Sequence, residues 1–132
     1  MTHMLDTCIC VSLIRKKSES LRRRFESYEL GDLVVSSITE AELRFGAEKS
    51  RAPERNHTQL DHLFLALPVL PFDRSAAVEY GSIRAALELS GNTIGPMDLL
   101  IAAHGRSTGL KLVTNNYSEF SRVPDLDVED WS

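Results

Sequence analysis

The stretch Thr93-Ile94-Gly95-Pro96-Met97-Asp98-Leu99-Leu100-Ile101-Ala102-Ala103-His104 places one acidic residue at the start of a predicted helix. Gly95-Pro96 favours a helix start there, because proline suits the first helical turn and glycine permits a sharp entry. Asp98 then lies in the first turn, and the apolar residues after it indicate a helix buried on most sides. One explanation for Asp98 is complementarity to the helix dipole, which is worth roughly 0.3–1 kcal/mol. A functional role is the alternative, and it depends on where the other acids lie.

Predicted strands and helices alternate along the chain on either side of this stretch. The patterns predict strands at 3–5, 33–37, 110–114 and 126–128, with an edge strand or a plain connection at 69–72. They predict helices at about 9–25, 42–49, 60–67, 74–90 and 96–108, and a short one from Ser118. This alternation indicates an α/β fold, in which a central, mainly parallel β-sheet is flanked by helices as an α/β/α sandwich.

The length of the chain indicates one domain spanning residues 1–132, with 42% hydrophobic residues to form its core. No apolar run approaches the roughly 20 residues of a membrane span, and the N-terminus lacks the pattern of a signal peptide. We therefore expect a cytoplasmic protein. Cys8 and Cys10 are too close together for an ordinary disulfide and too few for a zinc site, so we interpret both as free thiols with a packing role.

The net charge of −4 argues against nucleic-acid binding by bulk charge, so any such contact must be local. The first predicted helix carries a cluster of cations on its polar face. They are Arg15, Lys16, Lys17, Arg22, Arg23 and Arg24. Two interpretations stay open for this cluster: a solvated face, or a contact with RNA or an acidic partner.

Acidic or amide side chains follow several strands at the same predicted edge of the sheet. Asp6 ends the first strand, Glu42 and Asp98 lie at helix starts, and Asn116 and Glu119 follow the strand that ends at residue 114. Ligands bind outside the carboxyl ends of the strands in such sheets. Acids on adjacent strands would lie roughly 5–10 Å apart. Two carboxylates at about 5 Å repel by roughly 3 kcal/mol at an effective dielectric near 20, so the group calls for a cation.

Structural explanations compete with this one. Thr39 and Glu42 fit a capping box, in which the two side chains satisfy N–H groups at a helix start. With 19 acids in 132 residues, some will also reach helix starts by chance. His104 lies on a different helical face from Asp98, which favours a structural role, and Trp131 is interpreted as an anchor for the C-terminal tail.

An all-oxygen donor set favours Mg²⁺ or Mn²⁺ over zinc. The chemistry that uses such a site is phosphodiester hydrolysis, in which the metal generates hydroxide from water and neutralises charge on the phosphate. Carboxylates suit this reaction because they hold a hard cation and leave positions for water and substrate. The residues by themselves thus make a metal-dependent phosphodiesterase a candidate, beside the structural explanations.

The chain resembles the PIN-domain ribonucleases, specifically the VapC toxins of bacterial toxin–antitoxin pairs, over nearly its whole length. Five motifs in order carry the resemblance. They are Met4-Leu5-Asp6-Thr7; Ser37-Ile38-Thr39-Glu40-Ala41-Glu42-Leu43 with Gly46; Ile94-Gly95-Pro96-Met97-Asp98 with Ile101-Ala102; Val113-Thr114-Asn115-Asn116 with Glu119-Phe120; and Glu129-Asp130-Trp131. Each motif alone is weak, and the ordered set is specific.

The resemblance implies a magnesium-dependent endoribonuclease with a PIN fold, with Mn²⁺ as a possible substitute. It implies Asp6 and Asp98 as metal ligands, Glu42 as the third acid of a triad, and Glu119 as a further acid that holds metal or water. The remaining implied site residues support these acids or contact substrate. They are Thr7, Thr114 and Asn116.

The resemblance also implies substrate and partners. The branch with this Asn-Asn pair and this Glu-Asp-Trp ending resembles enzymes that cut initiator tRNA in the anticodon stem-loop and halt translation. A VapB-type antitoxin would occupy the site and bind operator DNA, and the toxin would form a homodimer and a hetero-oligomer with the antitoxin.

Two rival functions remain. A haloacid-dehalogenase-like phosphatase needs a second Asp two residues after the first, and Cys8 stands at that position. A catalytically silent partner-binding module on the same fold is the other alternative. The intact acids Asp6, Glu42 and Asp98 argue against it.

Overall fold

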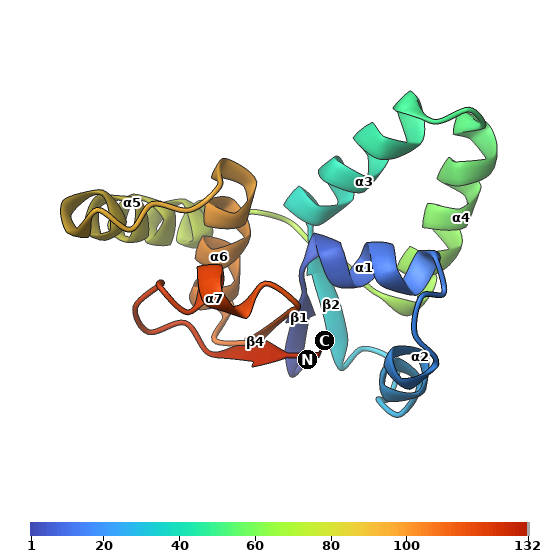
Figure 1. Ribbon diagram of the computed structural model, residues 1–132, viewed down its shortest axis with the longest axis horizontal. Helices are drawn as coiled ribbons and strands as arrows, with labels where there is room; N and C mark the ends of the chain where they lie inside the picture. The colour runs from blue at the N-terminus through green and yellow to red at the C-terminus, as the bar shows by residue number, and fades with distance from the viewer. Residues whose placement is uncertain (132) are drawn as a thin grey trace.

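The computed structural model describes residues 1–131, and its centre is a parallel sheet of order β3-β2-β1-β4-β5 (Figure 1). The strands are β1 (His3–Leu5), β2 (Leu33–Ser36), β3 (Val69–Leu70), β4 (Lys111–Thr114) and β5 (Val128–Asp130). In the register of the sheet, His3 lies opposite Leu33 on one side and Lys111 on the other. All four pairings are parallel, so the carboxyl ends of the strands meet at one edge.

Seven helices flank the sheet within residues 1–131. They are α1 (Thr7–Ile14), α2 (Glu19–Glu26), α3 (Ser37–Lys49), α4 (Pro53–Ala66), α5 (Arg74–Ser90), α6 (Pro96–Thr108) and α7 (Tyr117–Phe120). In Figure 1, α1 to α4 lie on one side of the sheet, and α5 to α7 lie on the other. The predicted α/β/α architecture is therefore confirmed. None of the helices in the described part of the chain is long and apolar enough to cross a membrane.

Two apolar cores fill the layers, because successive residues of a strand point to opposite faces of the sheet. Leu5, in β1, packs with the residues of α1 to α4. Met4, its neighbour, packs with Ile101 of α6 and Phe120 of α7 on the opposite face. All four side chains are fully buried. The strands thus pack against both helical layers. This packing fixes the relative positions of the helices that begin at the carboxyl edge.

Several predicted boundaries are confirmed. The Asp73 side chain accepts a hydrogen bond from the Ala76 N–H and caps α5, and Gly91 ends that helix with a left-handed φ of 71°. Pro96 begins α6 as expected. Residues 69–70 form an edge strand that pairs with β2.

The single helix predicted over residues 9–25 is wrong. The chain forms α1 and α2 instead, because Lys16 takes a left-handed φ of 53° and interrupts the helical path. The Ser18 side chain then accepts a hydrogen bond from the Leu21 N–H and starts the second helix. Helix α4 is also longer than predicted, since it begins at Pro53.

The predicted capping box of Thr39 and Glu42 is wrong as well. Ser36 is the N-cap of α3, and its side chain accepts a hydrogen bond from the Ile38 N–H. Thr39 is fully buried within the first turn of that helix, and Glu42 lies further along it. The capping explanation for Glu42 therefore no longer applies.

Trp131 anchors the C-terminal tail, as the sequence indicated. The side chain is 5% exposed and stacks on Tyr28 with ring centroids 5.5 Å apart. The Arg24 guanidinium lies 4.6 Å from the centroid of the Trp131 ring, and the indole N–H donates to Glu129. These contacts fix the end of β5 against the segment that follows α2.

We expect Trp131→Ala to lower the free energy of unfolding by about 3 kcal/mol, because it empties a buried aromatic position. Urea denaturation monitored by circular dichroism would measure the change. Leu89→Ala is the control, since Leu89 is 90% exposed and its replacement should change stability by less than about 0.5 kcal/mol. Equal stabilities for the two variants would contradict the anchoring role.

Candidate active site

Asp6 lies at the junction of β1 and α1 and is only 3% exposed to solvent. Its backbone N–H donates to the Val113 carbonyl, which ties this junction to β4. Oδ1 accepts hydrogen bonds from the Cys8 thiol at 2.7 Å and from the Ile9 N–H at 3.2 Å. Oδ2 accepts one from the Thr114 hydroxyl at 2.5 Å. Since each carboxylate oxygen has two lone pairs, Oδ2 keeps an acceptor position free for a ligand.

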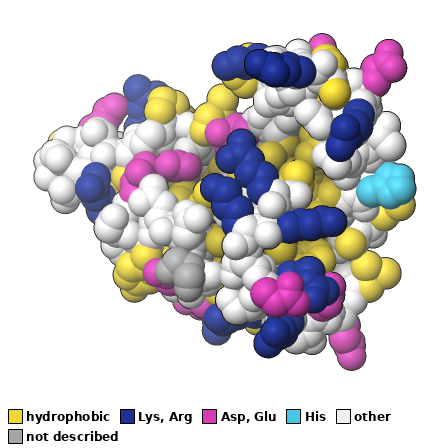
Figure 2. All heavy atoms as spheres, turned by 45° about the vertical axis from the view of Figure 1, so that its right-hand side comes forward, with side chains coloured by type: hydrophobic (Ala, Val, Ile, Leu, Met, Phe, Trp, Pro, Cys, Tyr) yellow, Lys and Arg dark blue, Asp and Glu magenta, His cyan; other side chains and the backbone are white. Residues whose placement is uncertain are grey.

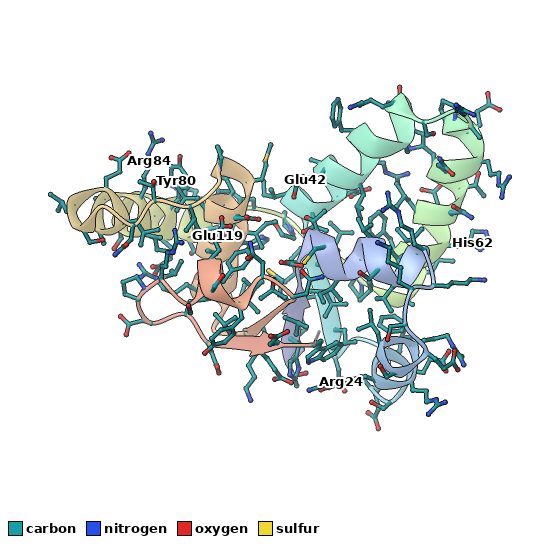
Figure 3. All side chains as sticks on the ribbon, viewed as in Figure 1. Arg24, Glu42, His62, Tyr80, Arg84 and Glu119 are labelled. Carbon is teal, nitrogen blue, oxygen red and sulfur yellow. The ribbon has the colours of Figure 1, made fainter. Side chains whose placement is uncertain are left out.

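Glu42 is oriented by a neighbour from another element. The Thr7 hydroxyl, in the first turn of α1, donates to Glu42 Oε1 at 2.6 Å, and it lies 3.2 Å from the Thr39 hydroxyl. The link crosses from α1 to α3, both of which begin at the carboxyl edge of the sheet. Figure 3 shows Glu42 on α3 and Glu119 on α7, on either side of the strand ends. The Glu42 carboxylate is thus held at the edge where Asp6 lies.

Glu119 and Asp98 approach each other beside the entry of α6. Glu119 Oε1 accepts a hydrogen bond from the Gly95 N–H at 2.9 Å, and Oε2 accepts one from the Asn116 amide at 2.8 Å. A Cβ atom placed on Gly95 would lie 3.6 Å from Asp98 Oδ2 and 3.6 Å from Glu119 Oε1. Gly95 therefore lies against both carboxylates, which are close enough to each other for Glu119 to raise the pKa of Asp98.

The pKa values of the acids reflect their burial and their proximity to one another. Burial, contact with Glu119, and the charges of Glu119, Asp6 and Glu42 raise the pKa of Asp98 to about 7. Burial also raises the pKa of Asp6, although the hydrogen bonds from Cys8 and Thr114 oppose it. The Gly95 N–H holds the pKa of Glu119 below its ordinary value. The acids therefore share one region and repel one another there.

A divalent cation fits this donor set. The donors are carboxylate oxygens, which Mg²⁺ and Mn²⁺ favour, and bound positive charge would remove the repulsion that raises the pKa of Asp98. Among residues 1–131, no three His, Cys, Asp or Glu side chains are already arranged around one metal position. Asp6 and Asp98 are the residues predicted to hold the ion, and this assignment stays a prediction.

Each of the three residues predicted to support the acids contacts one of them, and their role in the site stays a prediction. Thr7 contacts Glu42, Thr114 contacts Asp6, and Asn116 contacts Glu119. His104 lies apart from them and is structural, since it is 2% exposed and its Nδ1 lies 2.7 Å from the Ser36 hydroxyl. Burial lowers the pKa of His104 and favours its neutral form.

Sequence reasoning missed other contacts. The sequence predicts a packing role for Cys8, yet its thiol donates to Asp6, and burial beside that acid raises the pKa of Cys8 to about 12. The Gly95 backbone N–H was also missed as the donor to Glu119. The charge of Arg122 acts on Glu119 as well. A thiol two residues after an acid at a helix start is a signal that could have indicated the first contact.

The raised pKa of Asp98 predicts a pH-dependent stability in EDTA. The carboxyl ionises near 3.8 in the unfolded chain and near 7 in the folded one, so stability from this group is lost as the pH rises between these values. We expect Asp98→Asn to raise Tm at both pH 5 and pH 8, and the gain to be about 4 °C larger at pH 8, because only part of the stability has been lost at pH 5. Differential scanning calorimetry at both pH values would measure this. An equal Tm difference at both would contradict the electrostatic origin.

Comparisons with known proteins find similar sequences and similar folds. A PIN domain profile matches residues 3–126. The tRNA(fMet)-specific endonuclease VapC of Shigella flexneri is 47% identical over 129 residues, which cover 98% of this chain and 97% of that protein.

Two solved complexes have the same fold. DNA-bound VapBC from Salmonella typhimurium matches with a TM-score of 0.95 and 45% identity, covering 100% of this chain and 99% of that one. VapBC2 from Rickettsia felis, bound to a DNA fragment from its promoter, matches with a TM-score of 0.92 and 39% identity over the full length of both chains. The chain therefore belongs to the PIN-domain family and, within it, to the VapC ribonucleases.

Proposed function

We propose that this chain is the toxin of a toxin–antitoxin pair and acts as an endoribonuclease that hydrolyses RNA phosphodiester bonds. The observation that carries the proposal is the group of four acids at one sheet edge, in a chain 47% identical to a tRNA(fMet)-specific endonuclease. We further propose Mg²⁺ as cofactor, with Mn²⁺ as a substitute, because the donors are carboxylate oxygens. A bound ion would supply a nucleophilic hydroxide and neutralise charge on the phosphate.

The chain's own residues prepare the site for hydrolysis. Asp6 and Asp98 would hold the ion, with Asp6 kept in place by the Thr114 hydroxyl. Glu42, oriented by Thr7, can accept the proton that the attacking water releases. Glu119 is fixed through Gly95 and can hold a water molecule beside Asp98. The water oxygen forms a bond to phosphorus as the bond to the leaving ribose oxygen breaks, and that oxygen takes up a proton.

The proposed substrate is initiator tRNA, cut in its anticodon stem-loop so that translation stops. This choice follows the relative from Shigella flexneri, whose name specifies tRNA(fMet). A VapB-type antitoxin would neutralise the enzyme and supply contacts with operator DNA, by analogy with the DNA-bound VapBC complexes. We also propose a homodimer and a toxin–antitoxin hetero-oligomer, acting in the cytoplasm, where initiator tRNA is used.

A catalytically silent module on the same fold is less well supported. A module that only binds a partner has no use for an acid such as Asp98, whose pKa burial and the neighbouring carboxylates raise to about 7. Such groups with perturbed pKa values are typical of functional sites. The dedicated contacts that Asp6 and Glu119 receive also favour chemistry over binding alone.

Cleavage of initiator tRNA by purified, antitoxin-free protein tests the proposal directly. Cleavage should require Mg²⁺ or Mn²⁺ and stop with EDTA, and Asp98→Asn should lower the rate at least about 100-fold, because it removes a predicted ligand. Glu54→Gln is the matched control, since Glu54 is an exposed acid on α4. A folded Asp98→Asn protein that cuts at the wild-type rate would refute the site assignment. A wild type that cuts no RNA would favour the silent module.

Thr7 offers a finer test of the role of Glu42. Thr7→Val keeps the side-chain shape and removes the hydroxyl that orients this carboxylate, so we expect the single-turnover rate to fall about tenfold. Thr7→Ser keeps the donor and should stay near the wild-type rate. Equal rates for the valine and serine variants would show that the hydroxyl is dispensable.

A further inference from the structure

Arg122 lies beside the acids, on the side of the site that α6 and α7 form. It follows Ser121, the C-cap of α7, and its backbone N–H donates to the Glu119 carbonyl at 3.2 Å. Its side chain reaches the loop before α6, where a terminal guanidinium nitrogen donates to the Thr93 carbonyl at 3.1 Å. Thr93 is two residues before Gly95, whose N–H holds Glu119. Arg122 thus joins the two segments that carry the acids on this side.

Only one N–H group of the Arg122 side chain is engaged within residues 1–131. The bond to Thr93 uses one of the five donors of a guanidinium. Arg122 is exposed and forms no ion pair with any residue of the described chain. Its charge lowers the pKa of Glu119, yet the two side chains form no salt bridge. The guanidinium is therefore held in position with donors open to solvent.

Other cations have partners or a structural explanation. Figure 2 shows Lys and Arg side chains spread over the side of the molecule where α1 to α4 lie, and on that side Arg44 pairs with Asp61. Arg15 lines a groove of about 560 Å³ together with Glu42, but it is also the C-cap of α1, where the helix dipole favours a cation. Arg122 follows a helix of only four residues, so a helix dipole explains it poorly.

The acids repel the substrate, and a fixed cation would counter that repulsion. Carboxyl groups crowd this edge, and the chain carries a net charge of −4, so an RNA backbone is repelled as it approaches. Neutralisation at the scissile phosphate leaves the neighbouring phosphates uncompensated, and side chains such as arginine contact such phosphates and position the strand. A guanidinium suits this task because its planar fork can donate two parallel hydrogen bonds to one phosphate.

We propose that Arg122 binds a backbone phosphate of the RNA substrate on the α7 side of the acids, through the donors that the bond to Thr93 leaves open. The inference rests on the proposed nuclease function and adds a residue that holds the strand. The bond to Thr93 fixes the side chain before RNA arrives, so less conformational freedom is lost on binding. Because phosphate contacts carry no base information, Arg122 contributes affinity and register, and it does not select the sequence.

Neutralising Arg122 tests the contact through the salt dependence of RNA binding. Arg122→Gln should weaken binding of initiator tRNA about tenfold at 0.15 M salt, and it should lower the slope of log K against log[salt] by about one. Arg122→Lys keeps the charge and loses the fork, so it should keep the slope and weaken binding only about threefold. Binding would be measured by filter retention in an Asp98→Asn background, which prevents cleavage.

Lys111→Gln is the matched control. Lys111 is exposed, forms no ion pair with any residue of 1–131, and begins β4, whereas Thr114 ends that strand beside the acids. Its replacement removes one positive charge at the amino edge of the sheet, so affinity and salt slope should stay those of the parent. Equal slope changes for Arg122→Gln and Lys111→Gln would report net charge alone and would overturn the contact.

A purely structural role for Arg122 gives a different result. If Arg122 only braced the loop before α6, Arg122→Gln would lower Tm and kcat and leave the salt slope unchanged, and that result would overturn the phosphate contact. The proposed contact predicts instead, in the active background, a KM raised about tenfold and a kcat near the wild-type value. Arg122→Lys should recover most of that loss in KM.

The outcomes separate this inference from the proposed function. A wild type that neither binds nor cuts tRNA would refute the nuclease function together with the contact. Wild-type cleavage with an unchanged salt slope in Arg122→Gln would overturn the contact alone. Weaker antitoxin binding in that variant, with RNA binding intact, would assign the guanidinium to an acidic protein segment and would also overturn the phosphate contact.

Discussion

Crowding of carboxylates at the carboxyl edge of a parallel sheet is the constraint on which the rest of this structure depends. Burial and like charge both disfavour ionised acids, and they raise the pKa of Asp98 to about 7. Only a rigid scaffold keeps such groups together. Met4 and Leu5 bind β1 into both cores, so that Asp6, the next residue, cannot retreat toward solvent. Burial of the apolar core thus stabilises an arrangement of carboxylates that their mutual repulsion opposes.

Short polar donors make this crowding tolerable. The Thr114 hydroxyl holds Asp6, the Thr7 hydroxyl holds Glu42, and the Gly95 N–H holds Glu119. Each donor comes from an element other than the one that carries its acid, so the site exists only when the elements have docked. The site therefore forms as the chain folds. A substitution that disturbs the packing of these elements also disturbs the catalytic geometry.

Local patterns predicted much of the fold. The alternation of strands and helices predicted the α/β/α sandwich. The cap at Asp73 and the left-handed glycine at Gly91 predicted the two ends of α5, because these effects act within a few residues. Predictions failed where several local solutions compete. Thr39 could have capped α3, but Ser36 does so, and the pattern over residues 9–25 suits one helix although Lys16 divides it. Propensity is too weak to decide such cases against tertiary packing.

The sequence by itself predicted that Asp6, Glu42 and Asp98 share an edge, because alternating strands and helices indicate a parallel sheet whose carboxyl ends meet. It also determined the family, through motifs that need no coordinates. Only the tertiary structure decided that Cys8 donates to Asp6, and that Arg15 at the end of α1 lines the same groove as Glu42. The physical reason is the sequence separation over which each effect acts. Periodicity and capping depend on residues a few positions apart, whereas these hydrogen bonds and hollows involve residues that are distant in the chain.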